Sequence, residues 1–214
     1  MSELRFADAE ALADLGTFVA RARALDADGA IRLQAHGMAL AAYVGVLPGR
    51  GLMADGAVIG LRVMPLAEAG DLDVTVPLAA ISDRLARTAA TGTAGDAMLP
   101  VPPATVSAGW AAVAPPRSGW ERVGELPTAT LESVAAQGIA EIAQGAPAEA
   151  GGHAVTALRQ RVWARQTETI PPVAAGGAFA AYALGFVGSG PTATVFSHGR
   201  WTRISTEGGH VLLR

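Results

Sequence analysis

Residues 170–188 read IPPVAAGGAFAAYALGFVG and contain no charged side chain, and the charge-free run around them covers residues 169–197. The pair Pro171-Pro172 suits the entry of a helix, where a missing backbone N–H costs nothing, and Gly185 and Gly188 suit its exit. Apolar residues lie on every side of the helix between them, and a helix of this kind is buried. We therefore expect the rest of the C-terminal half to pack around this helix.

The composition limits the classes of protein to which the chain can belong. Of its 214 residues, 50% are hydrophobic, 5% are aromatic and 16% are charged, which indicates a globular chain rather than a disordered one. All sixteen basic residues are arginine. Cysteine is absent, which excludes disulfides, thiolate catalysis and cysteine-bound zinc. A chain of this length holds one large domain or two small ones.

Charge is unevenly distributed, although the formal net charge is only −3. Residues 1–149 hold ten arginines and seventeen acidic residues, a balance of −7, whereas residues 150–214 hold six arginines and two acidic residues, a balance of +4. Such asymmetry is typical of a surface that binds nucleic acid or another anion. It is also expected when two halves of a chain attract each other, and we give this interpretation precedence.

The N-terminal segment MSELRFADAEALADLG is acidic and amphipathic, so it lacks the basic and apolar regions of a signal peptide. The stretch 170–188 is long enough to span a membrane, but alanine and glycine dominate it and no basic residue flanks it directly. We therefore expect a buried core helix, a cytoplasmic protein and no membrane association.

The first half, residues 1–88, predicts an antiparallel sheet with helices on one face. Asp8 is suited to cap a helix that runs to about Leu25, because aliphatic residues recur at helical spacing between them. Four strands should follow, with turns at 36–37 and 68–71, and then a second helix. The expected strands are 31–35, 38–47, 58–64 and 72–76, and the second helix is 77–87.

Residues 89–126 are rich in small residues, glycine and proline, which predicts a connecting segment or a long surface loop. A short strand at 105–113 is compatible with its pattern. Trp110 and Trp120 are expected to anchor the segment onto a core, the usual role of tryptophan in a chain with few aromatic residues.

The second half, residues 127–214, predicts three helices followed by a three-stranded meander. The fold class is therefore α+β, with two small subdomains, 1–88 and 127–214, joined by 89–126. The helices are expected at 129–144, with Ile139 inward, at 153–166 and within 170–188, and the strands at 193–197, 200–206 and 210–214.

The meander allows a prediction of register if His198-Gly199 and Gly208-Gly209 are two-residue loops. One face should then be apolar and pack on the central helix; it holds Val195, Ile204, Val211 and Leu213. The other face should place Phe196 opposite Trp201, Thr194 and Arg214 opposite Arg203, and Glu207 opposite His210. Because like charges directly opposite are unfavourable, the two arginines indicate either a bound anion or a solvated edge, and we favour the solvated edge.

No motif predicts a catalytic residue, a metal site or a cofactor. The glycine patterns at 49–54 and 188–193 resemble a dinucleotide fingerprint, but neither joins a strand to a helix, so both are interpreted as turns. The four histidines lack metal-ligand spacing, and no carboxylate is placed to orient His198 beside Ser197. Asp71 and Asp73 share a strand face without evidence of a cleft between them.

Three helices followed by a hairpin in a basic segment also have the order of a winged helix, a nucleic-acid-binding fold. The third helix would read the bases, yet Tyr182 is its only sizeable polar side chain, whereas a recognition helix needs Arg, Asn or Gln. This alternative therefore rests on contacts with the phosphate backbone. The residues that would make them are Arg159, Arg161, Arg165 and Arg200.

The C-terminal sequence VFSHGRWTRISTEGGHVLLR, together with PPRSGWERVGEL upstream, resembles segments of an uncharacterised protein family of high-GC bacteria. The resemblance covers mainly the second half of the chain. It implies no activity and no functional residue.

These observations favour a non-enzymatic binding or protein-interaction module, with a protein partner or a second copy of the chain as the ligand. An aromatic pair beside arginine is typical of a contact hot spot. The candidate surface is the outer face of the meander, formed by Phe196, Trp201, Arg203, His210 and Arg214. Nucleic-acid binding by the basic half is the alternative.

Overall fold

The computed structural model describes residues 3–51, 54–90, 97–145 and 151–214. Helices and antiparallel strands occur in both halves of the chain, which confirms the α+β class. The chain forms two compact units. Unit 1 comprises Met1–Val46 and Gly60–Ala114, and unit 2 comprises Leu47–Ile59 and Pro115–Arg214.

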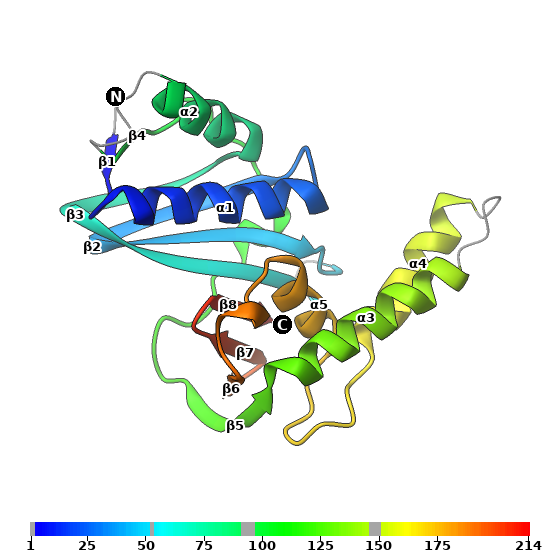
Figure 1. The fold of residues 1–214 in the computed structure, drawn as a ribbon. Coiled ribbons are helices and arrows are strands. Elements are labelled where there is room, and N and C mark those ends of the chain that lie inside the picture. The colour runs from blue at the N-terminus through cyan, green and yellow to red at the C-terminus, as the bar shows by residue number, and fades with distance from the viewer. Residues whose placement is uncertain (1–2, 52–53, 91–96, 146–150) are drawn as a thin grey trace. The chain divides into compact units, whose positions relative to one another are not determined.

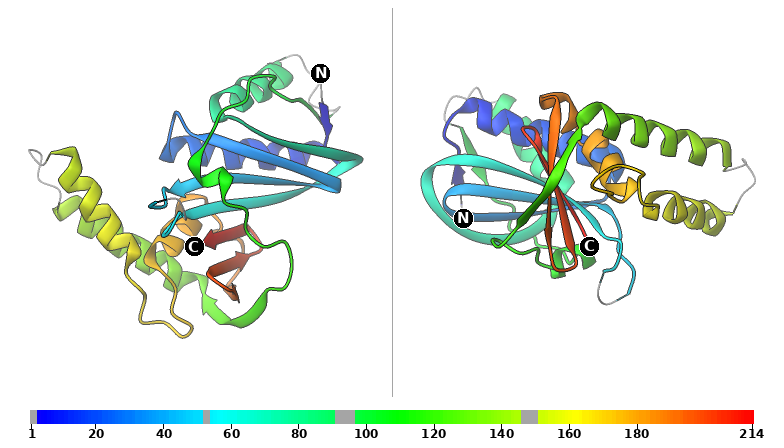
Figure 2. Two further views of the ribbon diagram at one scale, coloured as in Figure 1. Left: turned by 180° about the vertical axis from the view of Figure 1, so that it is seen from behind. Right: turned by 90° about the horizontal axis from the view of Figure 1, so that it is seen from below.

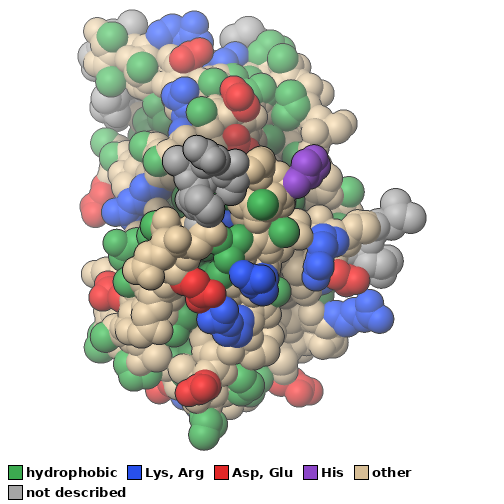
Figure 3. Space-filling model, turned by 90° about the vertical axis from the view of Figure 1, so that its right-hand side faces the viewer, with side chains coloured by type: hydrophobic (Ala, Val, Ile, Leu, Met, Phe, Trp, Pro, Cys, Tyr) green, Lys and Arg blue, Asp and Glu red, His purple; other side chains and the backbone are tan. Residues whose placement is uncertain are grey.

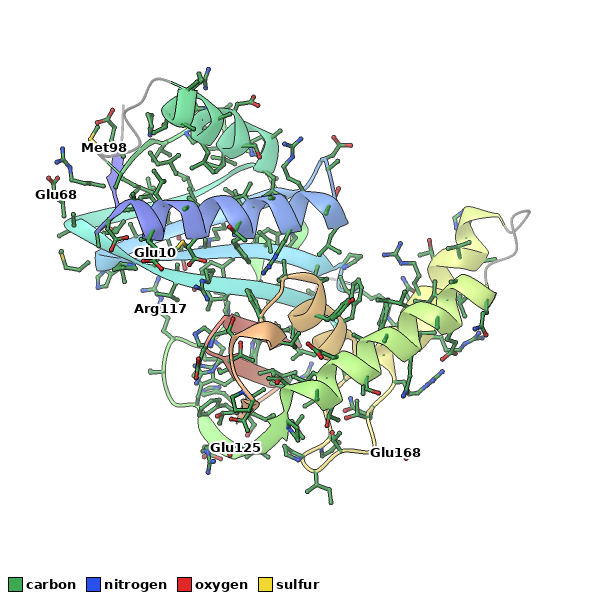
Figure 4. All side chains as sticks on the ribbon, viewed as in Figure 1. Glu10, Glu68, Met98, Arg117, Glu125 and Glu168 are labelled. Atoms are coloured by element: carbon green, nitrogen blue, oxygen red, sulfur yellow. The ribbon has the colours of Figure 1, made fainter. Side chains whose placement is uncertain are left out.

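Unit 1 contains two long neighbouring strands, two helices, a small two-stranded sheet and a 3-10 turn (Figure 1). Its elements are β1 (Glu3–Arg5), α1 (Ala9–Leu25), β2 (Ala30–Leu47), β3 (Val58–Pro77), α2 (Leu78–Ala90), β4 (Met98–Pro100) and η2 (Gly109–Ala112). β1 pairs with β4 in antiparallel fashion. Beside this small sheet, Arg5 of β1 contacts both Glu68 and Met98, which Figure 4 labels.

The first helix confirms its predicted start. The Asp8 carboxylate accepts a hydrogen bond from the backbone N–H of Ala11 at 2.7 Å, which satisfies one of the free donors at the helix start. The apolar side chains of the helix recur at helical spacing and are buried. They include Leu12, Leu15, Phe18 and Val19.

The four short strands predicted for unit 1 are wrong, because each pair forms one long strand. β2 has 18 residues and β3 has 20. Gly37, with φ +56°, does not end its strand, but it shifts the buried alternation so that Ala35 and then Leu40 face the core. The polar residues at 68–71 belong to a solvent-exposed part of β3 rather than to a turn.

Four antiparallel strands of unit 2 lie side by side in the order β5-β6-β7-β8, within a sheet of six strands (Figure 2). The helices of unit 2 lie between β5 and β6 in the sequence, and α3 packs against α4. The elements are β5 (Glu121–Pro127), α3 (Thr128–Gly145), α4 (Gly152–Ala164), α5 (Ala175–Ala183), η3 (Val187–Ser189), β6 (Thr192–His198), β7 (Trp201–Thr206) and β8 (Gly209–Leu213).

The central helix is confirmed as a buried helix, but it is shorter than the stretch 170–188. In α5, every residue from Ala175 to Ala181 is buried. Gly177 allows the close approach to the sheet, since a Cβ atom there would lie 2.8 Å from Leu213 Cδ2 and 2.9 Å from Ile204 Cδ1. The helix therefore packs on the apolar inner face of the meander, as predicted.

The segment 89–126 contains more regular structure than expected, while its residues 91–96 lie outside the described residues. β4 and most of β5 fall within it, and β5 extends the meander by pairing with β6. The predicted strand at 105–113 is wrong, because the 3-10 turn η2 occupies part of that range.

The register within the meander also differs from the prediction. His198 lies opposite Trp201 and Thr206 opposite Gly209, so the turn residues are Gly199-Arg200 and Glu207-Gly208. Each loop is displaced by one residue, which moves the pairing by two residues and leaves every side chain on its predicted face. Val195, Ile204, Val211 and Leu213 are accordingly buried on the inner face.

One inward residue of α3 was also predicted incorrectly. Ile139 is 40% exposed, and its neighbour Gly138 faces inward against the indole of Trp163. Trp163 in turn stacks on Phe179 of α5, with ring centroids 4.4 Å apart. A small residue is needed at position 138 because the indole occupies the space in which a side chain would lie.

Candidate functional site

The outer face of the unit 2 sheet carries a cluster of aromatic rings and arginines. Phe196 lies opposite Arg203, and Trp201 lies two residues before Arg203 on the same strand, so the three side chains share one face. Arg214, which follows β8, and Trp120, which precedes β5, complete the cluster through the ring contacts described below. We call Trp120, Phe196, Trp201, Arg203 and Arg214 the aromatic–arginine face.

Arg203 is held between two aromatic rings. Its Cζ atom lies 4.2 Å from the ring centroid of Phe196 and 4.8 Å from that of Trp120, both within cation–π range. Trp120 is fixed in turn, because its Nε1–H donates to the Pro116 carbonyl at 2.9 Å and its ring meets the edge of His198 at 5.9 Å. The position of the Arg203 guanidinium is therefore restricted by both rings.

Arg214 is held by a second contact of the same kind. Its Cζ atom lies 5.5 Å from the ring of Trp201, which is only 6% exposed. The backbone of Arg214 is also fixed, because its carbonyl accepts from Gly56 N–H at 2.7 Å and its N–H donates to Ala57 at 3.1 Å. Both arginines of the face thus have restricted conformations.

Neither arginine has an acidic partner among the described residues. The Nε atoms of Arg203 and Arg214 are buried and make no hydrogen bond to the described part of the chain. Burial lowers the pKa of Arg203 from its ordinary value, because desolvation disfavours the charged form. A buried donor without a partner is costly, so an incoming anion would stabilise this arrangement.

Strand β5 carries two acidic side chains, and Glu121 lies opposite Ser197, on the other face of the sheet. Glu125 of β5, labelled in Figure 4, accepts from Arg122 at 2.7 Å and lies opposite Thr194. It therefore does not neutralise Arg203.

His210 lies on the outer face but belongs to a different set of contacts. The predicted placement of Glu207 directly opposite His210 is wrong, because His210 lies opposite Ser205 and Glu207 is in the turn. Its Nδ1 atom is 2.9 Å from Ser205 Oγ. Of the five predicted surface residues, the structure brings Phe196 together with Arg203, and Trp201 together with Arg214.

One residue of the aromatic–arginine face, Trp120, was absent from the predicted surface, and so was His198, whose ring contacts Trp120. Trp120 lies in the segment predicted to be a connecting loop, where no strand β5 was expected, so nothing placed it beside Phe196. The short spacing between Trp120 and the alternating residues 121–126 was the signal available for this strand.

The arginines of the nucleic-acid alternative do not form a base-reading surface. Arg159 and Arg161 are exposed on α4, and Arg200 is exposed in the turn before β7. Arg165 forms a bidentate ion pair with Glu141, with N–O distances of 2.9 and 3.0 Å. This contact lowers the pKa of Glu141 and raises the pKa of Arg165. On the face in Figure 3, basic and acidic side chains are interspersed.

The third helix of that alternative is α5, and Tyr182 is its one exposed side chain. Residues 175–181 are all buried. A recognition helix must expose polar side chains to the groove. What remains of the winged-helix interpretation is the set of exposed arginines.

The other predicted motifs have structural roles where the structure describes them. Asp73 accepts from Arg32 at 2.7 and 2.8 Å and from Gln34 at 2.8 Å, which ties β3 to β2. Arg50 and Asp55 form an antiparallel bridge within the first glycine motif, whose residues 52–53 lie outside the described residues. Among the described residues, no group of three or more His, Asp or Glu side chains could hold a metal ion. No described helix is long and apolar enough to cross a membrane.

Family models match both parts of the chain. Residues 1–110 match the family described as Domain of unknown function (DUF8010), and residues 115–214 match the one described as Domain of unknown function (DUF8185). The first match covers half of the chain, so this two-unit α+β protein belongs to the DUF8010 family. The resemblance to an uncharacterised family is thereby confirmed. A search of curated proteins found no match. The second match begins at residue 115, where the chain passes from unit 1 to the C-terminal segment of unit 2.

Proposed function

We propose that the protein is a non-enzymatic binding module whose aromatic–arginine face binds carboxylates of an acidic protein segment. The observation that carries this proposal is the pair of guanidinium groups at Arg203 and Arg214. Both are held by aromatic rings, both have a buried Nε atom without a hydrogen bond, and neither pairs with a described acidic residue.

A carboxylate is the ligand that such a guanidinium recognises best. The planar fork of arginine donates two parallel N–H bonds to a carboxylate, and bonds of this charge-assisted kind are about twice as strong as neutral ones. Aromatic rings stack on the faces of a guanidinium, whereas a carboxylate binds at its N–H edge. Arg203 also loses little rotamer freedom on binding, because Phe196 and Trp120 already restrict it.

The composition of the face favours a protein ligand over nucleic acid. Tryptophan and arginine are enriched at the contact hot spots of protein interfaces. Nucleic acid binds through a row of basic residues that neutralise successive phosphates. The face offers two arginines among aromatic and apolar side chains, and Leu212, which lies between them, is buried.

The proposal is tested by titrating the protein with hexaglutamate while tryptophan fluorescence is recorded, because Trp120 and Trp201 both lie in the face. Arg203→Gln should weaken binding about tenfold or more, since a hydrogen bond to a charged group contributes about 1.5–3 kcal/mol. Arg200→Gln removes the same charge from an exposed turn and serves as the matched control. Equal loss in both variants, or no loss in Arg203→Gln, would contradict the proposal.

Hexalysine and mixed-sequence DNA complete the titration. Hexalysine should not bind, because the face carries no free acid partner for it among the described residues. DNA binding that falls steeply with salt and is weakened by Arg159→Ala would instead support the nucleic-acid alternative. A cytoplasmic location stays a prediction.

A further inference from the structure

The two arginines of the aromatic–arginine face occupy diagonal positions on neighbouring strands. Arg203 of β7 lies opposite Leu212 of β8. The same antiparallel register, continued by two residues, places Trp201 opposite Arg214, whose guanidinium lies over the Trp201 ring. Side chains at such diagonal positions on one face of an antiparallel pair are about 7–8 Å apart.

Both guanidinium groups are displaced from their own strands in the same direction. The Arg203 guanidinium lies 4.2 Å from the ring centroid of Phe196, which is directly opposite it on β6. The Arg214 guanidinium lies 5.5 Å from the ring centroid of Trp201 on β7. Because the strand order is β6-β7-β8, each side chain crosses to the next strand on the β6 side. Parallel displacements preserve a separation, so the two guanidinium groups keep the diagonal spacing of about 7–8 Å.

An extended peptide presents its side chains at the same spacing. The chain rises about 3.4 Å per residue and successive side chains point to opposite sides, so residues two apart lie about 7 Å apart on one side. Building on the proposed function, we propose that the ligand is an extended acidic segment whose acidic residues alternate with other residues. One carboxylate binds Arg203, and the carboxylate two residues along binds Arg214.

Other arrangements of acidic residues do not serve both arginines. Adjacent residues of an extended segment point to opposite sides, and residues four apart are about 14 Å from each other. A helix brings residues three or four apart together, but a short acidic segment does not hold a helix in water. Both arginines have a buried Nε atom without a hydrogen bond, so a ligand that reaches only one of them leaves the other without a partner.

The test compares two hexapeptides of identical composition, with both termini blocked so that only the side chains carry charge. Glu-Thr-Glu-Thr-Glu-Thr has acidic residues two apart, whereas Glu-Glu-Thr-Thr-Thr-Glu has none at that spacing. Each is titrated into the full chain while tryptophan fluorescence is recorded. The alternating peptide should bind about tenfold or more tightly than the other, because it gains a second charge-assisted contact. This comparison uses the natural protein and requires no variant.

Variants assign the preference to the pair of arginines. Arg214→Gln should abolish it, whereas Arg200→Gln, in the exposed turn before β7, should retain it. Equal affinity for both peptides, with Arg203→Gln weakening both, would overturn the alternating ligand and leave the proposed function intact. A preference that survives in Arg214→Gln would also overturn it. If neither peptide binds, the proposed function and the alternating ligand both fail.

Discussion

Gly138 of α3 provides the sharpest test of how unit 2 is packed. A methyl group at this position would overlap Cζ3 of Trp163 and lie 2.6 Å from its Cη2 atom. The indole has little room to move away, because Trp163 is 4% exposed and stacks on Phe179 at 4.4 Å. Gly138→Ala should therefore force the ring or the helix out of place.

The magnitude follows from two opposing effects. Overpacking of a well-packed core costs about 1–3 kcal/mol, whereas replacing glycine by alanine inside a helix contributes about 1 kcal/mol. The net effect of Gly138→Ala is a loss of up to about 2 kcal/mol. Each kcal/mol lowers the Tm of a chain of this size by about 2–4 °C.

Gly16→Ala is the matched control for this substitution. Gly16 also lies inside a helix, α1, but a Cβ atom there would be at an ordinary contact distance of 3.8 Å from Leu85 Cδ1. The control should gain up to about 1 kcal/mol from helix propensity. Thermal and urea unfolding followed by circular dichroism measure both variants. If Gly138→Ala stabilises the protein as much as Gly16→Ala does, the packing of Trp163 against α3 is wrong.

Three further predictions concern charged residues outside the aromatic–arginine face. Asp8→Ala removes the cap of α1 and should reduce the free energy of unfolding by about 1 kcal/mol in urea denaturation, whereas Asp8→Asn should keep most of the stability. Arg165→Gln should raise the pKa of Glu141 in a carboxyl NMR titration, because the hydrogen bonds from Arg165 lower that pKa. The contribution of this ion pair to folding stability is present above the unfolded-state pKa of Glu141 and is lost as pH falls through the folded-state pKa. Asp73→Ala and Arg32→Ala should show a coupling of about 1 kcal/mol in a double-mutant cycle, and strictly additive effects would contradict their pairing.

Local signals in the sequence were sufficient for several elements. Asp8 and the apolar spacing after it predicted α1, because a cap and a helical stripe are defined within a few residues. The charge-free stretch 170–188 predicted the buried helix α5, since a helix without a polar face has no stable exposed position. The inner face of the meander followed from strict alternation along each strand.

Contacts between residues far apart in the sequence determine the features that local sequence patterns did not predict. The pair His36-Gly37 has the composition of a turn, yet cross-strand contacts carry β2 through it as one strand. A displacement of one residue in a hairpin loop is invisible in the alternation pattern, although it changes the partner of Arg203 from Thr194 to Phe196. Trp120 joins the cluster only through the pairing of β5 with β6, which spans about seventy residues of chain.

The most direct test of the binding face is an NMR spectrum of the arginine side chains while hexaglutamate is added. The Nε–H signals of Arg203 and Arg214 should shift together, because the carboxylate supplies the partner that these donors lack. The signal of Arg200, in its exposed turn, should remain unchanged. If Arg203 and Arg214 do not respond, or if all arginine signals shift equally, the aromatic–arginine face is not a carboxylate-binding site.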